Sequence, residues 1–407
     1  HRIALRMASS ATVALFVVLA APGVGSASSC LSLKNHDDMI YTAQLGLGTP
    51  VQYVNVVADT GSMDLLVLSK AAACQGALDC GSNHNSFDGA VSTSLVHTDE
   101  YISASYGQGD VMGEKILETA RLGDMTVDKQ SVMLMQMIAL KNFDAMDYDG
   151  IVGFGLLPPA RFDYVRVNST AEVSQWSNES SMLESARRQL TVSPIVSFCL
   201  GRPGAQTARL DLGAATPDVS FDYFPVVGRR TWTLAFGGFS SATDSHANGT
   251  AGTGYCATNK CVGLLDTGTS LITMPTRLLL ELQTLILSVD EDCSNIDQLP
   301  DLQINLGGRW VKIAPQYYVG RFADRNAAAK LLGEDFFHRT SAAAAVHGRA
   351  AATAAYESAS PGRPRRMTPA IAAGSVSSAS SASLGGLTNP HLSDSAGEGG
   401  GGAAGGE

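Results

Sequence analysis

The sequence predicts an all-β fold with a few short helices, arranged as two lobes. Short apolar or alternating runs broken by Gly and Pro recur along the chain, beginning with YTAQLGLGTP and VQYVNVVADTG. A second observation is one local motif that occurs twice, 207 positions apart, which indicates a duplication with one copy in each lobe. Helical periodicity is confined to two segments, Met182–Leu190 and Pro275–Leu287.

The predicted strands share an apolar or alternating pattern and end at turn-forming residues. In chain order they cover residues 41–50, 51–61, 65–69, 114–127, 130–137 and 208–213. The folded body, residues 28–340, is long enough for two domains. We place the N-terminal lobe at residues 28–197 and the C-terminal lobe at residues 198–340.

The two ends of the chain differ from this body. Residues 1–27 have the pattern of a signal peptide, with Arg2 and Arg6 before the apolar run Ala11–Ala21 and a cleavage site after Ala27. The run is too short to span a bilayer, and a retained anchor or buried helix is the alternative interpretation. Residues 341–407 are rich in Ala, Ser and Gly, which predicts a disordered tail.

Charge excludes one class of partner. The chain has 38 acidic and 28 basic residues, a formal net charge of −10, which disfavours binding to nucleic acid. We expect no membrane span after removal of the signal peptide. Three Asn-x-Ser/Thr sequons, at Asn168, Asn178 and Asn248, are compatible with a glycoprotein of the secretory pathway.

The repeated motif carries the chemistry. An apolar strand delivers Asp59-Thr60-Gly61-Ser62, and a second strand delivers Asp266-Thr267-Gly268-Thr269. Two carboxylates placed a few Å apart cannot both ionise, so the pair holds one proton over a broad acidic range. One member can then act as a base towards water while the other acts as an acid towards a carbonyl oxygen. A single copy would be explained as a turn triplet, but two matching copies favour catalysis.

These motifs resemble the pepsin-like aspartic endopeptidases, the two-lobed eukaryotic family, over about residues 33–337. LLDTGTSLITMPT around Asp266 is the most specific match, and VVADTGSMDLLVLS around Asp59 fits less closely. SASYGQG, residues 103–109, resembles the flap hairpin that covers the substrate. Asp149–Gly153 resembles the segment that packs behind the first catalytic loop, and Leu331–Gly333 is our candidate for its second-lobe counterpart.

The resemblance implies two β-barrel lobes with a central cleft and assigns a role to each motif residue. Asp59 and Asp266 would be the catalytic dyad. The other implied site residues are the dyad supports Thr60, Gly61, Ser62, Thr267, Gly268 and Thr269, and the substrate-binding flap residues Tyr106, Gly107 and Gly109. The reaction would need no metal or cofactor. The implied protein is a monomeric acid endopeptidase acting on polypeptides, either secreted or in an acidic vacuolar or lysosome-like compartment.

The cysteines admit two interpretations near the first motif. The resemblance implies small disulfide loops, Cys74–Cys80 and Cys256–Cys261. Cys74 and Cys80 with His84 could instead be zinc ligands, but the sequence offers no fourth ligand beside them. The resemblance also suggests that Cys293 has lost a disulfide partner.

Two departures from the family pattern keep a second hypothesis open. Leu66 stands where the family has a Trp that braces the flap tyrosine, and the sequence changes character after Phe337. The second lobe is therefore predicted to be incomplete at its C-terminal end. The alternative function is a catalytically impaired relative that binds peptide or protein ligands in the cleft.

Overall fold

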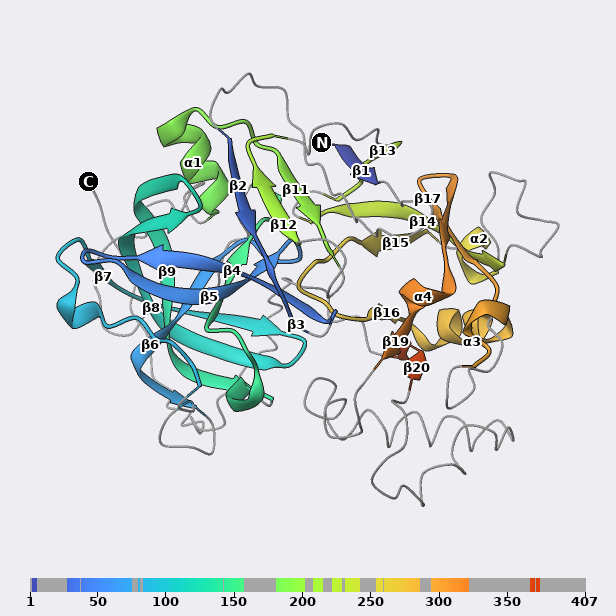
Figure 1. Ribbon diagram of the computed structural model, residues 1–407, viewed down its shortest axis with the longest axis horizontal. Coiled ribbons are helices and arrows are strands. Elements are labelled where there is room, and N and C mark those ends of the chain that lie inside the picture. Colours follow the sequence, from blue (N-terminus) through green and yellow to red (C-terminus); the bar gives the residue numbers. More distant parts are fainter. Residues whose placement is uncertain are drawn as a thin grey trace, which may run out of the picture.

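The computed structural model describes most of both lobes (Figure 1). The described residues are 2–5, 28–36, 38–74, 80, 83–141, 143–156, 181–201, 208–214, 222–228, 231–241, 254–258, 260–285, 294–321, 367–369 and 371–373. Among them, no helix combines the length and the apolar composition that crossing a membrane requires.

The N-terminal lobe is built on one eight-stranded sheet. In spatial order its strands are β3 (Lys34–His36), β4 (Ile40–Leu47), β5 (Gln52–Asp59), β10 (Gly150–Gly153), β6 (Leu65–Cys74), β9 (Met125–Leu140), β8 (Gly109–Leu122) and β7 (Val96–Tyr106). Strand β4 also pairs with β8, with Leu45 opposite Leu122, so the sheet curls and closes on itself. Strands β3 and β7 remain at the two ends of the strand order.

Alternation along the strands gives the lobe an apolar core on each face of the sheet. On β5, Val56 and Ala58 join one buried cluster while Val57 joins the other. Leu65 and Leu66 of β6 divide in the same way. Successive side chains of a strand point to opposite faces, which explains the division. Each buried Val or Leu contributes about 1.5–3 kcal/mol to folding.

Strand β10 has a special position because it lies between β5 and β6. It runs parallel to β5 with Gly153 opposite Asp59, and antiparallel to β6 with Ile151 opposite Leu66. A β-carbon on Gly153 would lie 2.4 Å from the carbonyl carbon of Met63. Only glycine therefore allows this close packing directly behind the first motif.

A three-stranded sheet and a helix pack against the N-terminal lobe. The sheet consists of β11 (Val196–Cys199), β12 (Arg209–Leu212) and β2 (Ser29–Ser32). Helix α1 (Met182–Leu190) packs on β9, and the side chain of Gln189 accepts a hydrogen bond from the backbone N–H of Asp128. Its Glu184 lies in the first turn and its arginines in the last turn, which complements the helix dipole.

The described residues of the C-terminal lobe form a four-stranded sheet, three helices and several short pairings. The sheet order is β15 (Cys261–Leu264), β14 (Thr233–Ser241), β17 (Leu302–Leu306) and β18 (Arg309–Ile313). The helices are α2 (Tyr255–Thr258), α3 (Thr276–Leu285) and α4 (Pro315–Tyr318). The remaining strand pairs are β1 (Arg2–Leu5) with β13 (Asp222–Pro225), β16 (Ile272–Met274) with β21 (Ile371–Ala373), and β19 (Val319–Arg321) with β20 (Met367–Pro369). Short 3₁₀ helices in the two lobes are η1 (Gly89–Val91), η2 (Phe143–Ala145) and η4 (Ile296–Gln298).

The predicted fold class, all-β with a few short helices in two lobes, is confirmed. Both predicted helices are present, although α3 begins at Thr276, after the proline, and its last described residue is Leu285. Strand β1 lies within the predicted signal peptide, and β20 and β21 lie within the predicted tail. The sequons, Cys293 and the Leu331–Gly333 segment are outside the described residues.

Candidate active site

The two copies of the motif form matching loops. In the first, the carboxylate of Asp59 accepts hydrogen bonds from Gly61 N–H at 2.7 Å and from Ser62 Oγ at 2.5 Å. In the second, the carboxylate of Asp266 accepts from Gly268 N–H at 2.9 Å and from Thr269 Oγ1 at 2.6 Å. Each acid is thus held by the glycine two residues later and by the hydroxyl three residues later. Such donors fix a carboxylate in one orientation.

Hydrogen bonds between the threonines join the two loops across the lobes. The backbone N–H of Thr60 donates to Thr267 Oγ1, and the backbone N–H of Thr267 donates to Thr60 Oγ1, both at 3.0 Å. Each hydroxyl then donates to the opposite strand: Thr60 Oγ1 to the carbonyl of Leu265 at 2.8 Å, and Thr267 Oγ1 to the carbonyl of Ala58 at 2.6 Å. The four bonds fix the position of one loop relative to the other.

The glycines bring each loop against the opposite acid. A β-carbon on Gly61 would lie 2.6 Å from the carboxyl atoms of Asp266, and one on Gly268 would lie 2.5 Å from Asp59 Oδ1. No side chain larger than hydrogen fits at either place without moving a carboxyl group. The structure therefore brings the two predicted acids together at the junction of the lobes.

Burial and mutual repulsion set the electrostatics of this pair. Asp59 is only 7% exposed, and Asp266 is partly exposed. Burial and the neighbouring charge of Asp266 raise the pKa of Asp59 well above the usual aspartate range, although the Ser62 and Gly61 hydrogen bonds oppose this. At acidic pH the pair therefore retains a proton that can be given to a bound group, while the second carboxylate can accept one.

The predicted flap segment lies in a hairpin formed by β7 and β8. Tyr106 ends β7 opposite Gly109, and Gly107 lies in the connecting turn. Tyr106 packs against the same apolar cluster as Leu66, and its hydroxyl lies near the side chain of Ser62, which donates to Asp59. Burial raises the pKa of Tyr106 far above its usual range, and the negative charges of Asp64 and Asp59 add to the effect.

Two further residues near Asp59 were missed by sequence reasoning. Burial raises the pKa of Asp64 to about 7. Burial also raises the pKa of Tyr148 to about 12, with a contribution from the charge of Asp59. The sequence signal for Asp64 was a lone acid between the apolar residues Met63 and Leu65. The fold brings Tyr148 to the site from a distant segment, so its position along the chain gave no indication.

Both predicted disulfides are present, Cys74–Cys80 and Cys256–Cys261. Cys74 and Cys80 are therefore bonded to each other, which contradicts the zinc interpretation of these residues with His84. In the described part of the chain, no cluster of three His, Cys, Asp or Glu side chains could hold a metal ion. Cys199 is a buried thiol and Cys30 an exposed one.

Comparison with known proteins gives a consistent result. A model of the eukaryotic aspartyl protease family matches residues 40–341. Cathepsin D of Dictyostelium discoideum is 29% identical over 307 residues, which cover 72% of this chain and 73% of the relative. Cathepsin D of Clupea harengus is 28% identical over 306 residues, covering 71% and 69%. A probable vacuolar protease A of Arthroderma benhamiae is 27% identical over 312 residues, covering 73% and 70%.

Proposed function

Because the chain belongs to the eukaryotic aspartyl protease family, and so is an aspartic endopeptidase that hydrolyses peptide bonds, we propose that Asp59 and Asp266 are its catalytic dyad. The observation that carries this proposal is the close approach of each motif glycine to the carboxyl group of the opposite loop. Two acids from opposite lobes then flank one point, with matching donors behind each.

The proposed reaction uses this chain's two carboxyl groups and one water molecule. The ionised carboxylate removes a proton from water, and the water oxygen attacks the carbonyl carbon of the peptide bond. The protonated carboxyl gives its proton to the carbonyl oxygen, which yields a tetrahedral diol. The C–N bond then breaks as one carboxyl gives a proton to the nitrogen and the other carboxylate removes a proton from a diol hydroxyl, leaving a free carboxylic acid and an amine. No metal or other cofactor takes part in this scheme.

The remaining site residues have supporting roles in this proposal. The Thr60–Thr267 bonds hold the carboxyl groups at their separation, and Ser62 and Thr269 keep each acid in one orientation. Tyr106 on the flap would close over an extended polypeptide, with Gly107 and Gly109 forming the hairpin tip. Leu66 is fully buried and offers no polar atom to the flap, and the polar side chain near the Tyr106 hydroxyl is that of Ser62.

We expect acidic conditions to favour this chemistry. Because the pKa of Asp59 is raised, the dyad holds one proton throughout the acidic pH range. It loses this proton only at the higher pH at which both acids ionise. A catalytic pH range below neutrality fits an acidic vacuolar or lysosome-like compartment, or secretion into acidic surroundings. Disulfide bonds form in the oxidising secretory pathway, which agrees with this destination. We propose that the protein acts as a monomer.

The test uses the isosteric variants Asp59→Asn and Asp266→Asn. Each should lower kcat on a denatured protein substrate at about pH 4 by at least about 10³-fold, because each removes one proton-transfer group. Circular dichroism should show that both variants are folded. Full activity in either folded variant would refute the dyad.

The alternative, an impaired relative that binds ligands in the cleft, makes a different prediction. Its supporting observation is Leu66, buried at the place of the bracing tryptophan. The wild-type protein would then bind a statine-type transition-state mimic with measurable affinity but leave peptide bonds intact. Cleavage that the mimic inhibits would exclude this alternative.

A further inference from the structure

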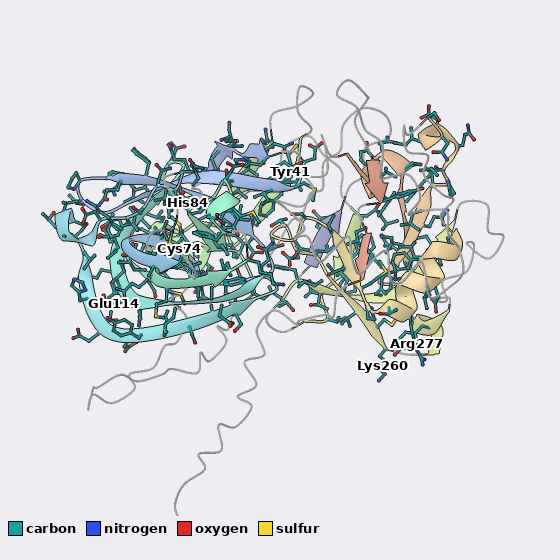
Figure 2. The ribbon with its side chains drawn as sticks, turned by 90° about the horizontal axis from the view of Figure 1, so that it is seen from below. Tyr41, Cys74, His84, Glu114, Lys260 and Arg277 are labelled. Atoms are coloured by element: carbon teal, nitrogen blue, oxygen red, sulfur yellow. A yellow bond between two sulfur atoms is a disulfide. The ribbon has the colours of Figure 1, made fainter. Side chains whose placement is uncertain are left out.

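A buried histidine lies in the N-terminal lobe beside Asp149, the residue that precedes β10. His84 follows the Cys74–Cys80 disulfide loop and lies in the N-terminal lobe (Figure 2). Its side chain is 1% exposed, and that of Asp149, which faces it, is 3% exposed. The ring of Phe143 stacks on the imidazole at 4.4 Å with an interplanar angle of 2°. Burying ionisable groups costs free energy unless they are paired and hydrogen-bonded.

Both ring nitrogens of His84 face hydrogen-bond acceptors. Nε2 lies 3.0 Å from the carbonyl oxygen of Phe143. Nδ1 lies 3.5 Å from Asp149 Oδ1 and makes no hydrogen bond at its present position. A neutral imidazole has a single N–H, so one nitrogen would turn a lone pair towards an acceptor. Only the imidazolium offers a proton to both sides, and a small rotation then completes the bond to Asp149.

Asp149 connects this histidine to the candidate active site. Its carboxylate accepts hydrogen bonds from the backbone N–H of Asn55 on β5 at 2.7 Å, and from the backbone N–H of Asn85 at 2.8 Å. The residue after it begins β10, whose Gly153 pairs with Asp59. Asp149 therefore ties β5, β10 and the His84 segment together.

Contacts between aromatic rings also connect His84 with the surroundings of Asp59. Phe143, which stacks on His84, meets the ring of Tyr148 edge-on with centroids 5.8 Å apart. Tyr148 is near enough to Asp59 for the carboxylate charge to act on its hydroxyl. The histidine thus supports both the strand that ends at Asp59 and an aromatic side chain close to it.

We propose that His84, as an imidazolium paired with Asp149, is a positioning residue of this endopeptidase, and that its deprotonation limits activity towards neutral pH. The charged ring holds Asp149, and Asp149 holds β10 against β5. Loss of the proton leaves a buried carboxylate facing a lone pair, which loosens the support behind Asp59. The activity part of this inference rests on the proposed role of Asp59.

The electrostatic surroundings agree with this assignment. Burial alone would lower the pKa of His84, but the adjacent Asp149 carboxylate together with the carbonyls of Phe143 and Tyr148 raises it. In the described part of the chain, Asp149 is the charged group that faces the ring. Asp147, on the same loop, lies against His36 instead.

The sign of the pH effect follows from the raised pKa. The unfolded histidine titrates near its ordinary value of about 6.5 and the folded one above it. The stabilising contribution is therefore complete below about pH 6.5 and is lost as pH rises through the folded pKa. His84 is charged throughout the acidic range in which we expect the enzyme to work.

The test compares His84→Gln with a matched control, His97→Gln. His97 also lies beside a carboxylate, 2.7 Å from Glu114, but its side chain is 64% exposed. We expect His84→Gln to lower kcat/KM about tenfold at about pH 4, with the curves of variant and wild type converging above the folded pKa. The gap between their thermal midpoints should shrink over the same pH range, and His97→Gln should follow the wild type throughout.

Two results would overturn the proposal. One is a constant offset between His84→Gln and wild type at every pH, which would indicate a purely structural role. The other is an NMR titration of the wild-type protein in which His84 is neutral at about pH 4, a measurement that needs no folded variant. The unfolding and NMR measurements do not use activity, so they remain decisive even if Asp59→Asn were to retain activity and the dyad proposal failed.

Discussion

Thr60 and Thr267, which lie 207 residues apart, hydrogen-bond to each other in both directions, with each backbone N–H donating to the other hydroxyl at 3.0 Å. Neither bond can form within a single lobe. The relative position of the two loops therefore depends on two side chains of only three heavy atoms each, and small substitutions there should have large effects.

Thr267→Ala tests this dependence. The change leaves the N–H of Thr60 and the carbonyl of Ala58 without partners, and each unpaired buried group costs about 1–3 kcal/mol. We expect a lower thermal midpoint and a kcat/KM reduced by at least about tenfold. Thr267→Ser keeps the hydroxyl and should recover most of both losses. Equal loss in the Ser and Ala variants would contradict the role given to this hydroxyl.

Gly61→Ala and Gly268→Ala should each disrupt the site sterically. The added methyl group would lie 2.6 Å from the Asp266 carboxyl atoms in the first variant and 2.5 Å from Asp59 Oδ1 in the second. Overpacking of this kind costs about 1–3 kcal/mol and displaces a carboxyl group. We expect near-complete loss of activity in a folded protein. Gly263→Ala is the control, because its methyl would meet Phe236 only at 3.8 Å and activity should persist.

Tyr106→Phe isolates the hydroxyl of the flap tyrosine, which lies near Ser62. The variant keeps the ring against the apolar cluster but removes the polar group beside the serine that donates to Asp59. A hydrogen bond from this hydroxyl to Ser62 or to a bound substrate would contribute about 0.5–1.5 kcal/mol, so kcat/KM should fall about two- to tenfold. Tyr101→Phe, on the exposed side of the same strand, should match the wild type in the same steady-state assay. An unchanged Tyr106→Phe enzyme would show that the hydroxyl does not act on the reaction.

Asp64→Asn should widen the pH range of stability. The pKa of folded Asp64, about 7 because of burial, exceeds that of an unfolded aspartate, about 3.9. The folded state therefore binds a proton that the unfolded state has released, and stability falls as pH rises from about 4 through about 7. Asparagine cannot ionise, so the thermal midpoint of the variant should fall less across this pH interval than that of the wild type. Asp124→Asn, at an exposed turn, provides the control.

Local sequence patterns predicted much of the fold and most of the candidate site. Alternation and turn residues predicted the strands around Asp59, and amphipathic spacing predicted the helix Met182–Leu190. The duplicated triplet predicted two loops with the same function, and the structure brings both to one place. These features depend on contacts within a few residues, or on a motif that can be recognised at any separation.

Features that depend on the pairing of distant segments were missed. His84 and Asp149 are 65 positions apart, and the sequence suggested cysteine partners for the histidine instead. Strand β21 was missed because its Ala-rich sequence has no strand pattern, and it forms only as a parallel partner of β16. The raised pKa of Asp64 likewise results from burial by residues distant in sequence.

The reciprocal threonine bonds have a consequence for synthesis of the protein. A ribosome that has made only the first lobe has produced Asp59 without Asp266. The second acid and its neighbour Thr267 come later in the chain. Under the proposed chemistry, an unfinished polypeptide cannot digest its neighbours during translation. The dyad can form only after the second motif has been made and its loop has docked on the first, so the order of the chain delays activity until the second lobe is folded.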